Sequence, residues 1–255
     1  MSGGTRAAAG DPQRTGRRGA SVLLVGVGGL GCPAAIALAS AGVATIGLCD
    51  DDEVELTNLH RQILFGEADV GSPKVDAAAR ALAARAPGLD VKVHRTRLLP
   101  ENAFELVRAH HLVLEGADNF ATKFLVADAC LLAGVPVVHA SAVRWVGTAL
   151  AVGPRGGPCY RCLFEDVPAG DDVPNCAEAG VLGPVVGVVA AAQVDLALAL
   201  LDGAPVAGEL ATFDGRTGAL RRRAIPARRE CPLCGPAPRI RRIAPETYAA
   251  PACAG

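Results

Sequence analysis

The sequence predicts an α/β protein with a Rossmann-like, doubly wound sheet, parallel in its first half and with antiparallel strands toward the C-terminus. Two observations carry this prediction. Apolar runs of strand length alternate with helical patterns from residue 21 to residue 143, an order typical of parallel sheets with helical crossovers. Residues 208–225 then read as a hairpin around Asp214 and Gly215, which adds antiparallel strands.

The first half contains the predicted parallel strands and their helices. The runs 21–27 and 44–49 are apolar almost throughout, as buried parallel strands are, and a helical pattern at 30–41 joins them. Pro73 stands in the first turn of an alanine-rich helix over 73–86. The pattern then predicts a strand at 91–96, a helix at 101–110, a strand at 111–117, a helix at 119–134 and a strand at 135–143.

The second half is less regular. A strand is expected at 148–154, and the stretch from 155 to 174 is rich in Gly, Pro and acidic residues. Residues 181–203 are largely apolar with several glycines, which predicts a buried helix packed closely on its neighbours. No repeat or linker divides the chain. We therefore expect one domain over 20–236, a flexible N-terminal segment over 1–19 and a flexible tail over 237–255.

The composition limits the class of protein. The 255 residues are 51% hydrophobic with a formal net charge of −1, so a substantial core is expected. The near-neutral charge and 4% aromatic content argue against a nucleic-acid binder. No apolar stretch of membrane-span length is free of Gly or charge, and no secretory signal is recognisable. We expect a cytoplasmic protein that does not bind membranes.

A glycine-rich turn marks the first candidate binding site. Gly26, Gly28 and Gly29 follow the first predicted strand and precede a helix, so backbone N–H groups and a helix N-terminus would face a ligand phosphate. Asp50 ends the second strand, where an acid can accept hydrogen bonds from ribose hydroxyls or simply cap the next turn. NAD and ATP would both suit these features, so they leave the ligand open.

Charged side chains further along favour one of these ligands. A turn-type segment places Asn58, Arg61 and Gln62 just beyond the acidic run, where a guanidinium can bind phosphates. Lys74 starts a helix against the helix dipole, which a nearby anion would explain, although a solvated surface lysine is an equal alternative. Asp118 ends a strand and could hold Mg²⁺ or cap the next helix. Such a set has no task in hydride transfer, so it favours ATP.

Two C-x-x-C pairs predict a structural zinc site with four thiolate ligands. One pair alone could be a redox pair, but two pairs in Gly/Pro-rich turns favour zinc. The 68 residues between the pairs exceed the spacing of a zinc finger, so the fold itself must bring the pairs together. Zinc would then staple residues 155–236. The four ligands would be Cys159, Cys162, Cys231 and Cys234.

The other cysteines have different surroundings. Cys176 lies in a polar loop before the apolar helix at 181–203, whose N-terminus would favour a thiolate, so Cys176 is the candidate nucleophile. Cys32, Cys49 and Cys130 lie in apolar stretches and are expected in the core.

Several motifs follow one another over residues 20–236: "VGVGGLG", "DDDEVELTNLHRQILF", "GSPK", "ADN", "PCYRC", "NCAEAGVLGPVVGV", "GELATFDG" and "CPLCG". Their order resembles the MoeB/ThiF adenylyltransferases, bacterial relatives of ubiquitin-activating enzymes, and is most similar to ThiF. The resemblance implies a homodimeric ATP-binding adenylation domain that acts on the C-terminal Gly-Gly of a ubiquitin-like sulfur-carrier protein. The tail carboxylate would attack the α-phosphate of Mg-ATP. Sulfur from a cysteine desulfurase or rhodanese would then replace AMP and leave a thiocarboxylate.

The resemblance also implies roles for individual residues. The ribose would be held by Asp50, Mg²⁺ would be positioned by Asp118, and zinc would be held by the four paired cysteines. Cys176 matches the cysteine that joins covalently to the carrier in ThiF-like members. Catalysis would use Asp118, Arg61, Lys74 and Cys176. The nucleotide-binding set carried over is Gly26, Gly28, Gly29, Asp50, Asn58, Arg61, Lys74 and Asp118.

Two departures from the family pattern and two alternatives accompany this interpretation. Family members usually begin with a helix bearing "RYxRQ", whose arginine reaches the partner subunit's ATP, whereas only Arg14, Arg17 and Arg18 stand nearby here. "GAD" also replaces the usual "CTD", with the acid kept. An NAD(P)-dependent oxidoreductase would explain the glycine turn but leave the other charged residues and the cysteines idle. A non-catalytic family member that binds the carrier is the other alternative.

Overall fold

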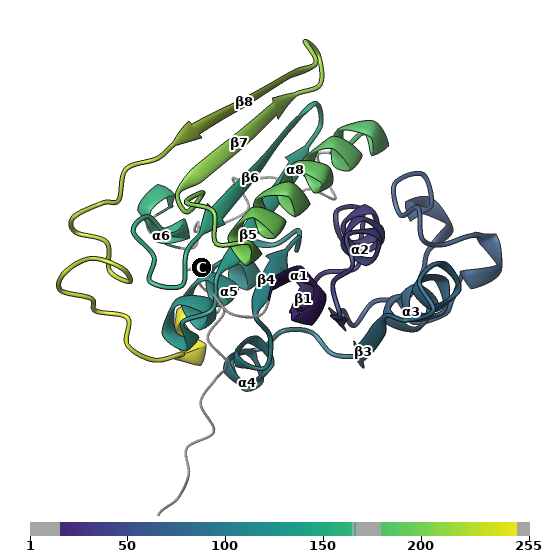
Figure 1. Ribbon diagram of the computed structural model, residues 1–255, viewed down its shortest axis with the longest axis horizontal. Helices are drawn as coiled ribbons and strands as arrows, with labels where there is room; N and C mark the ends of the chain where they lie inside the picture. The colour runs from purple at the N-terminus through teal and green to yellow at the C-terminus, as the bar shows by residue number, and fades with distance from the viewer. Residues whose placement is uncertain (1–15, 165, 167–179, 249–255) are drawn as a thin grey trace, which may run out of the picture.

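One mixed sheet with helices on both faces forms the body of the protein (Figure 1). The computed structural model describes residues 16–164, 166 and 180–248. Its eight strands lie in the order β3-β2-β1-β4-β5-β6-β7-β8. The predicted fold class is confirmed, because β3, β2, β1, β4 and β5 run parallel while β6, β7 and β8 pair antiparallel with their neighbours.

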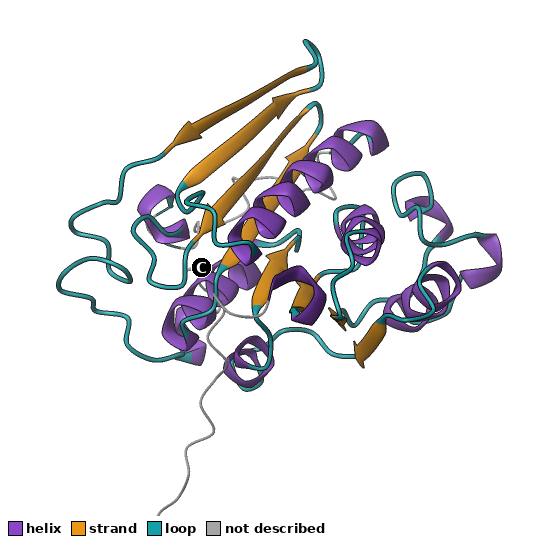
Figure 2. Cartoon of the chain, viewed as in Figure 1, coloured by secondary structure: helices purple, strands orange, loops and turns teal. Residues whose placement is uncertain are grey.

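The strands and longer helices lie within a few residues of the predicted segments (Figure 2). Three short 3₁₀ helices, at Leu56–Asn58, Glu67–Asp69 and Pro245–Thr247, and the short helices α1 and α6 were not predicted. The elements are α1 (Gly16–Gly19), β1 (Ser21–Val25), α2 (Gly31–Ser40), β2 (Thr45–Cys49), α3 (Lys74–Arg85), β3 (Asp90–His94), α4 (Ala103–Arg108), β4 (Leu112–Glu115), α5 (Phe120–Ala133), β5 (Val137–Val143), β6 (Val146–Val152), α6 (Tyr160–Leu163), α8 (Gly183–Leu201), β7 (Glu209–Asp214) and β8 (Ala219–Ala224).

Alternation along the strands divides the core into two layers. Val22 and Leu24 of β1 belong to the cluster that includes α2, α3 and α8, whereas Leu23 and Val25 belong to the cluster that includes α4 and α5. Successive strand residues point to opposite faces, and here both faces are covered. This is why the central strands read as continuous apolar runs rather than as alternating ones.

Helix α8 is the central helix of one layer. By length and composition alone it is apolar enough to cross a membrane. In this fold it contacts β5, β6 and α2, and Val185, Val189 and Leu196 are buried. The approach to β6 is close, since a Cβ on Gly147 would lie 2.3 Å from a methyl of Val189. The predicted buried helix is therefore present as a core helix.

The described residues after 236 are packed against the same body. Tyr248 is buried, and its hydroxyl donates to Asp128 Oδ2 at 2.8 Å. Asp128 also accepts two bonds from the buried Arg161 side chain at 2.7 and 2.9 Å. Ile240 and Ile243 pack on the adjacent core. These contacts carry the packed part of the chain beyond the expected boundary at 236.

The order of the strands creates a crevice at one edge of the sheet. The chain runs from β1 through β2 to β3 on one side, and then crosses back to β4 on the other side of β1. Connections that leave β1 and β4 in opposite directions open a crevice at the carboxyl ends of these strands, where ligands bind in doubly wound folds. The loops after β1, β2 and β4 meet there.

Candidate functional site

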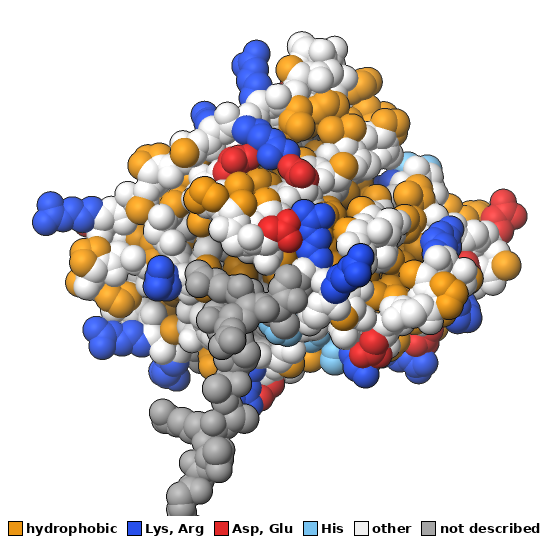
Figure 3. Space-filling model, viewed as in Figure 1, with side chains coloured by type: hydrophobic (Ala, Val, Ile, Leu, Met, Phe, Trp, Pro, Cys, Tyr) orange, Lys and Arg blue, Asp and Glu red, His pale blue; other side chains and the backbone are white. Residues whose placement is uncertain are grey.

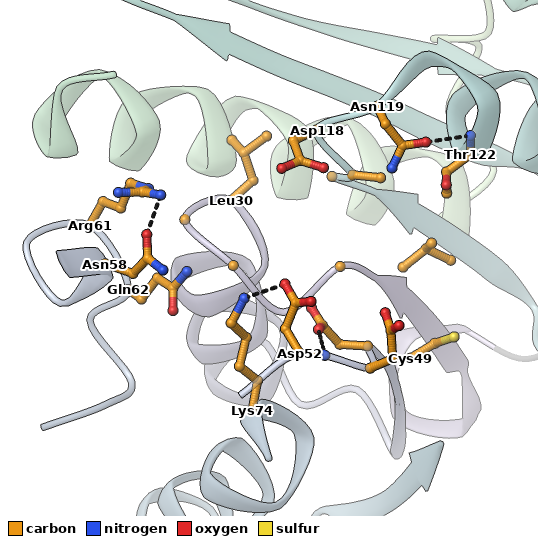
Figure 4. Close-up of a pocket in the computed structure, with 18 of the residues that line it drawn as sticks. Leu30, Cys49, Asp52, Asn58, Arg61, Gln62, Lys74, Asp118, Asn119 and Thr122 are labelled. Carbon is orange, nitrogen blue, oxygen red and sulfur yellow. Dashed lines mark hydrogen bonds and ion pairs between the residues drawn. The ribbon is translucent and has the colours of Figure 1, made fainter. Parts of the chain in front are cut away.

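A cavity of about 400 Å³ occupies this crevice (Figure 4). Besides the residues proposed from the sequence, its lining includes Gln62, Leu98, Asn119 and Val186. The fold thus brings together every residue that the sequence proposed for nucleotide binding, from three separate loops and the start of α3: Gly26, Gly28, Gly29, Asp50, Asn58, Arg61, Lys74 and Asp118.

The turn after β1 requires glycine for steric reasons. Gly26 has φ +91°, and a Cβ there would lie 3.2 Å from the carbonyl of Gly116. A Cβ on Gly31 would lie 2.1 Å from the Gly26 oxygen. Within the described residues, the N–H groups of Gly28 and Gly29 donate to no partner. Free N–H groups just before a helix make a site for an anion such as phosphate.

Asp50 fastens this turn to the end of β2. Its Oδ2 accepts from the Val27 N–H at 2.6 Å, and its Oδ1 accepts from the Asp52 N–H at 2.9 Å. Burial raises the pKa of Asp50, although these N–H groups and Lys74 act in the opposite direction. The carboxylate caps its turn, as the alternative reading expected, and each oxygen keeps a lone pair for a further donor.

Arg61 lies over the glycine turn and is oriented by its own loop. Its guanidinium donates to Asn58 Oδ1 (Figure 4). The Asn58 amide in turn donates to Glu55 at 2.9 Å. A Cβ on Gly29 would lie 3.4 Å from Arg61 Cδ, which measures how near the side chain comes to the turn. The loop therefore places the Arg61 guanidinium beside the Gly28 and Gly29 N–H groups, which have no partner among the described residues.

Lys74 is the second cation of the cavity. Its side chain is buried, and its Nζ lies 2.7 Å from Asp52 Oδ2. The reading of Lys74 as a solvated surface lysine is therefore wrong. Asp52 supplies one anion near the start of α3, but it is itself well exposed, so the ammonium can also meet a ligand phosphate at the cavity surface.

Asp118 is exposed at the cavity and, among the described residues, makes no hydrogen bond or ion pair. The cap of α5 is Asn119, which accepts from the Thr122 N–H at 2.9 Å (Figure 4). The alternative that Asp118 caps this helix is therefore wrong. The sequence analysis did not single out Asn119, although an Asn directly before a helical pattern is a recognisable cap signal.

Gln62, which the sequence places beside Arg61 without a role, is a further lining residue of the cavity. Its side chain is 3% exposed, and its Oε1 has no hydrogen-bond partner among the described residues. The amide nitrogen lies near Gly28, at 3.6 Å from the place of a Cβ on that glycine. The sequence signal for Gln62 is its place next to Arg61 in the turn-type segment after the acidic run.

The four paired cysteines converge as predicted. The Sγ atoms of Cys159 and Cys231 lie 3.5 Å apart, those of Cys162 and Cys234 lie 3.4 Å apart, and all four lie within 4.8 Å of one another. Four sulfurs at about 2.3 Å from a zinc ion would be about 3.8 Å apart, so the cluster fits zinc. Burial opposes ionisation, yet backbone N–H groups of Cys234 and Leu233 lower the pKa of Cys231 to about 7.

Among the described residues, no other sequence-predicted site residue lines the cavity. Cys176 and Arg14 lie outside the described residues. Arg17 donates to Asp202 at the end of α8, at 2.8 and 2.9 Å from its Nε, and it precedes β1, whose opposite end opens on the cavity. Arg17 therefore does not line the cavity of its own chain.

Comparison with known proteins identifies the class of fold and site. A model of the ThiF family matches residues 6–233, so the chain belongs to the ThiF family. The adenylyltransferase and sulfurtransferase MOCS3 of Anopheles gambiae is 43% identical over 227 residues, 88% of this chain and 52% of that protein. The sulfur carrier protein adenylyltransferase of Thermus thermophilus is 40% identical over 231 residues, 88% of this chain and 85% of that protein. The chain spans about half the length of the MOCS3 relatives.

Solved structures share the fold. E. coli MccB, crystallised with MccA-N7isoASN, superimposes with a TM-score of 0.76 at 23% identity, over 88% of this chain and 69% of that one. PaaA gives a TM-score of 0.69 at 21% identity, over 83% of this chain and 66% of that one. At this identity the likeness establishes the architecture alone.

Proposed function

We propose that this protein uses ATP to adenylate the C-terminal Gly-Gly carboxylate of a ubiquitin-like sulfur-carrier protein and so prepares it for thiocarboxylate formation. The observation that carries the proposal is the content of one cavity. N–H groups of the glycine turn and a carboxylate, all without partners in the described part of the chain, surround the same space as two cations. The relatives from Anopheles gambiae and Thermus thermophilus are named as adenylyltransferases, which supports the same chemistry.

Phosphate binding is the first task of the cavity. Arg61 and Lys74 would neutralise the triphosphate, and the N–H groups of Gly28 and Gly29 would donate hydrogen bonds to its oxygens. Asp50 would hold the ribose with its remaining lone pairs. Asp118 fits Mg²⁺, a cation that prefers oxygen ligands, because its carboxylate is exposed and unpartnered within the described residues. Bound there, Mg²⁺ would offset phosphate charge during the transfer.

The reaction itself is a displacement at phosphorus. A carboxylate oxygen of the carrier tail attacks the α-phosphorus, a new P–O bond forms, and the bond to the leaving pyrophosphate breaks. The carboxylate nucleophile is already ionised, so the residues of the cavity need only align the reactants and neutralise the growing charge on pyrophosphate. Arg61 and Lys74 are the residues suited to that charge.

Three further parts belong to the proposal. The cysteine cluster would hold zinc and join the segment around α6 to the chain after β8. The Cys176 thiolate would attack the acyl carbon of the adenylate, form a thioester with the carrier and release AMP. Hydrosulfide, released by a thiol from the persulfide of a cysteine desulfurase or rhodanese, would then displace the Cys176 thiolate and leave the thiocarboxylate. The proposed compartment is the cytoplasm, where ATP is available.

A homodimer is also proposed. Trp145, Val146, Leu182 and Val188 are exposed apolar residues, and the Arg144–Val181 bridge places the turn between β5 and β6 beside the start of α8. Figure 3 shows apolar side chains gathered over this end of the molecule, whereas Lys and Arg side chains are spread over the viewed face. An exposed apolar patch of this kind favours protein contacts. In a dimer, an arginine of the N-terminal segment could approach the partner's cavity.

Exchange of radiolabelled pyrophosphate into ATP tests the adenylation step. With a panel of Gly-Gly-ended carriers, wild type should exchange, and Asp118→Ala should lower the rate by at least about tenfold. Cys176→Ala should spare exchange, because it acts after adenylation. Glu101→Ala, an exposed acid outside the cavity, is the matched control. Carrier binding without any exchange would instead favour a non-catalytic protein.

A further inference from the structure

Glu115, Lys123 and His139 form a buried polar cluster directly beneath the loop that carries Asp118. Their exposed fractions are 0%, 4% and 3%. Glu115 ends β4, Lys123 lies in α5 and His139 lies in β5. The proposed chemistry gives these residues no task, and a buried ion pair is a poor source of stability compared with an apolar core. Their presence therefore needs another explanation.

The carboxylate of Glu115 is the centre of this cluster. Lys123 Nζ donates to both of its oxygens, at 3.1 and 2.9 Å, and to the Ala140 carbonyl at 2.7 Å. His139 Nδ1 lies 3.1 Å from Glu115 Oε2. Glu115 Oε1 accepts from the Ala117 N–H at 2.7 Å. Each of the three N–H groups of the Lys123 ammonium therefore has an acceptor. The hydrogen bond from the Ala117 N–H to Glu115 joins the cluster to the loop that lines the cavity.

The charges within the cluster balance. Burial alone would raise the pKa of Glu115, but Lys123 and His139 hold that pKa below its ordinary value. Burial lowers the pKa of His139, so the imidazole is neutral and its Nδ1–H donates to Glu115. Its Nε2 is buried without a partner among the described residues, as expected for the unprotonated nitrogen. One carboxylate thus faces one ammonium.

The loop above the cluster is held on both sides of Asp118. On one side, Ala117 is bonded to Glu115, and the Gly116 N–H donates to the Val25 carbonyl at 3.0 Å. On the other side, Asn119 caps α5. Asp118 itself makes no bond within the described residues, so its place in the cavity is set by these neighbours.

The backbone at Glu115 is fixed as well. Gln193 of α8 donates its amide N–H groups to the carbonyls of Glu115, at 2.9 Å, and Val138, at 2.8 Å. Elements β4, β5, α5 and α8 therefore meet at one residue, which lies three positions before Asp118. A side chain anchored in this way can hold a loop in one geometry.

We propose that Glu115 is a positioning residue for the candidate nucleotide site. Through its hydrogen bond with the Ala117 N–H, it holds the loop so that the Asp118 carboxylate can contact a cation bound to the nucleotide phosphates. Lys123 and His139 serve to hold the Glu115 carboxylate in place. This inference rests on the proposed function, because it gives Asp118 its task. It predicts that losing the acceptor for Ala117 weakens nucleotide binding only when Mg²⁺ is present.

Two double variants separate positioning from charge. Glu115→Leu with Lys123→Met removes both charges and the acceptor for Ala117. Glu115→Gln with Lys123→Met removes the same charges but keeps an oxygen that can accept from the Ala117 N–H. Its NH2 group then faces His139, whose Nδ1 accepts in the other neutral tautomer. Should the Leu variant fail to fold, Glu115→Ala with Lys123→Met provides the same comparison. Asp118→Ala is the reference for complete loss of the carboxylate.

Two measurements are made on each full-length variant. Amide hydrogen exchange of residues 116–119 reports whether the loop is held. The Kd of ATP, measured with Mg²⁺ and again with EDTA, reports whether the carboxylate meets the cation. We expect faster exchange and about tenfold weaker ATP binding with Mg²⁺ in the Leu variant. Binding in EDTA should be unchanged, and the Gln variant should behave as wild type in both assays.

The outcomes are distinguishable. Equal rates of amide hydrogen exchange at residues 116–119 in the Leu and Gln variants would overturn the proposal. An equal Kd of ATP in the presence of Mg²⁺ for these two variants would overturn it as well. A wild-type protein that binds no ATP under either condition would instead contradict the proposed function. In that case the exchange measurement would still decide whether Glu115 holds the loop.

Discussion

The charged residues of the cavity differ in whether the protein supplies them with hydrogen-bond or ion-pair partners. Arg61 bonds Asn58, and Lys74 bonds Asp52, whereas Asp118 has no partner in the described part of the chain. A phosphate would therefore compete for the cations with a neutral amide and an exposed carboxylate, both weak competitors in water. A metal cation would meet an unopposed acid at Asp118.

His110 gives a prediction of pH dependence. It is buried, and burial lowers its pKa below the ordinary value of 6.5. Below that pH the unfolded chain binds a proton that the folded protein does not, so stability is complete above about pH 6.5 and is lost as the pH falls through the folded-state pKa. Tm should fall between pH 7.5 and 5.5, and His110→Gln should make the fall shallower.

The matched control for this prediction is His60→Gln. His60 is exposed in the loop before Arg61. Its replacement should leave the change of Tm with pH as in wild type. Loss of metal at low pH would affect both variants alike, so the difference between them is the measured quantity. An unchanged slope in His110→Gln would contradict the prediction.

Individual site residues could be predicted where the chain order alone limits their position. Asp50 directly follows β2, and Asp118 comes three residues after the end of β4. Parallel strands end at the same edge of a sheet, so the convergence of these two acids followed from the sequence. The partners could not be predicted in this way. Asp52 beside Lys74 and the buried Gln62 depend on how the 55–73 loop folds back, which no periodic pattern specifies.

At the level of elements, long periodic segments were predicted and short ones were missed. The apolar runs of β1 and β2 and the apolar segment of α8 are long enough to be recognised from sequence. Each element lies within two residues of its predicted ends. Helix α6 has only four residues and follows Cys159 of the cysteine cluster. Short helices of this kind are held by tertiary contacts rather than by propensity, so the sequence alone does not show them.

The contact between β6 and α8 gives a pair of predictions with opposite sign. A Cβ on Gly147 would lie 2.3 Å from Val189 Cγ2 and 2.9 Å from the Ser141 oxygen, so Gly147→Ala should destabilise the protein by about 1–3 kcal/mol. A Cβ on Gly187 meets nothing within 4 Å, so Gly187→Ala within α8 should stabilise by roughly 0.5–1 kcal/mol. Urea unfolding measures both. A Gly147→Ala protein as stable as wild type would show that α8 can move away from β6.

At the level of the whole molecule, the cysteine cluster links distant parts of the chain. The spacing within each C-x-x-C pair predicted the type of site, but only the sheet explains how the pairs meet. Cys159 follows β6, and Cys231 follows β8, and these strands are joined through β7 in one antiparallel sheet. Tyr248 and Arg161 meet at Asp128 beside the cluster, a contact that no local pattern in the tail indicates.

Metal removal tests whether the cluster supports the fold. We expect one zinc per chain by elemental analysis, because four sulfurs already lie within 4.8 Å of one another. A metal that binds only the folded chain adds its binding free energy to folding. Chelation, or Cys234→Ala, should therefore lower Tm by more than about 5 °C. Cys130→Ala, a buried cysteine outside the cluster, should keep its zinc even where it lowers Tm.

The opposite result has a defined meaning. A purified protein without metal, in which Cys159 is disulfide-bonded to Cys162 by mass spectrometry, would favour the redox alternative for a C-x-x-C pair. All four Sγ atoms lie within 4.8 Å of one another, close enough for oxidation after a small movement. Zinc content that survives Cys234→Ala would place the metal elsewhere. Loss of zinc together with a fall in Tm, under reducing conditions, would establish that the metal joins the α6 segment to the chain after β8.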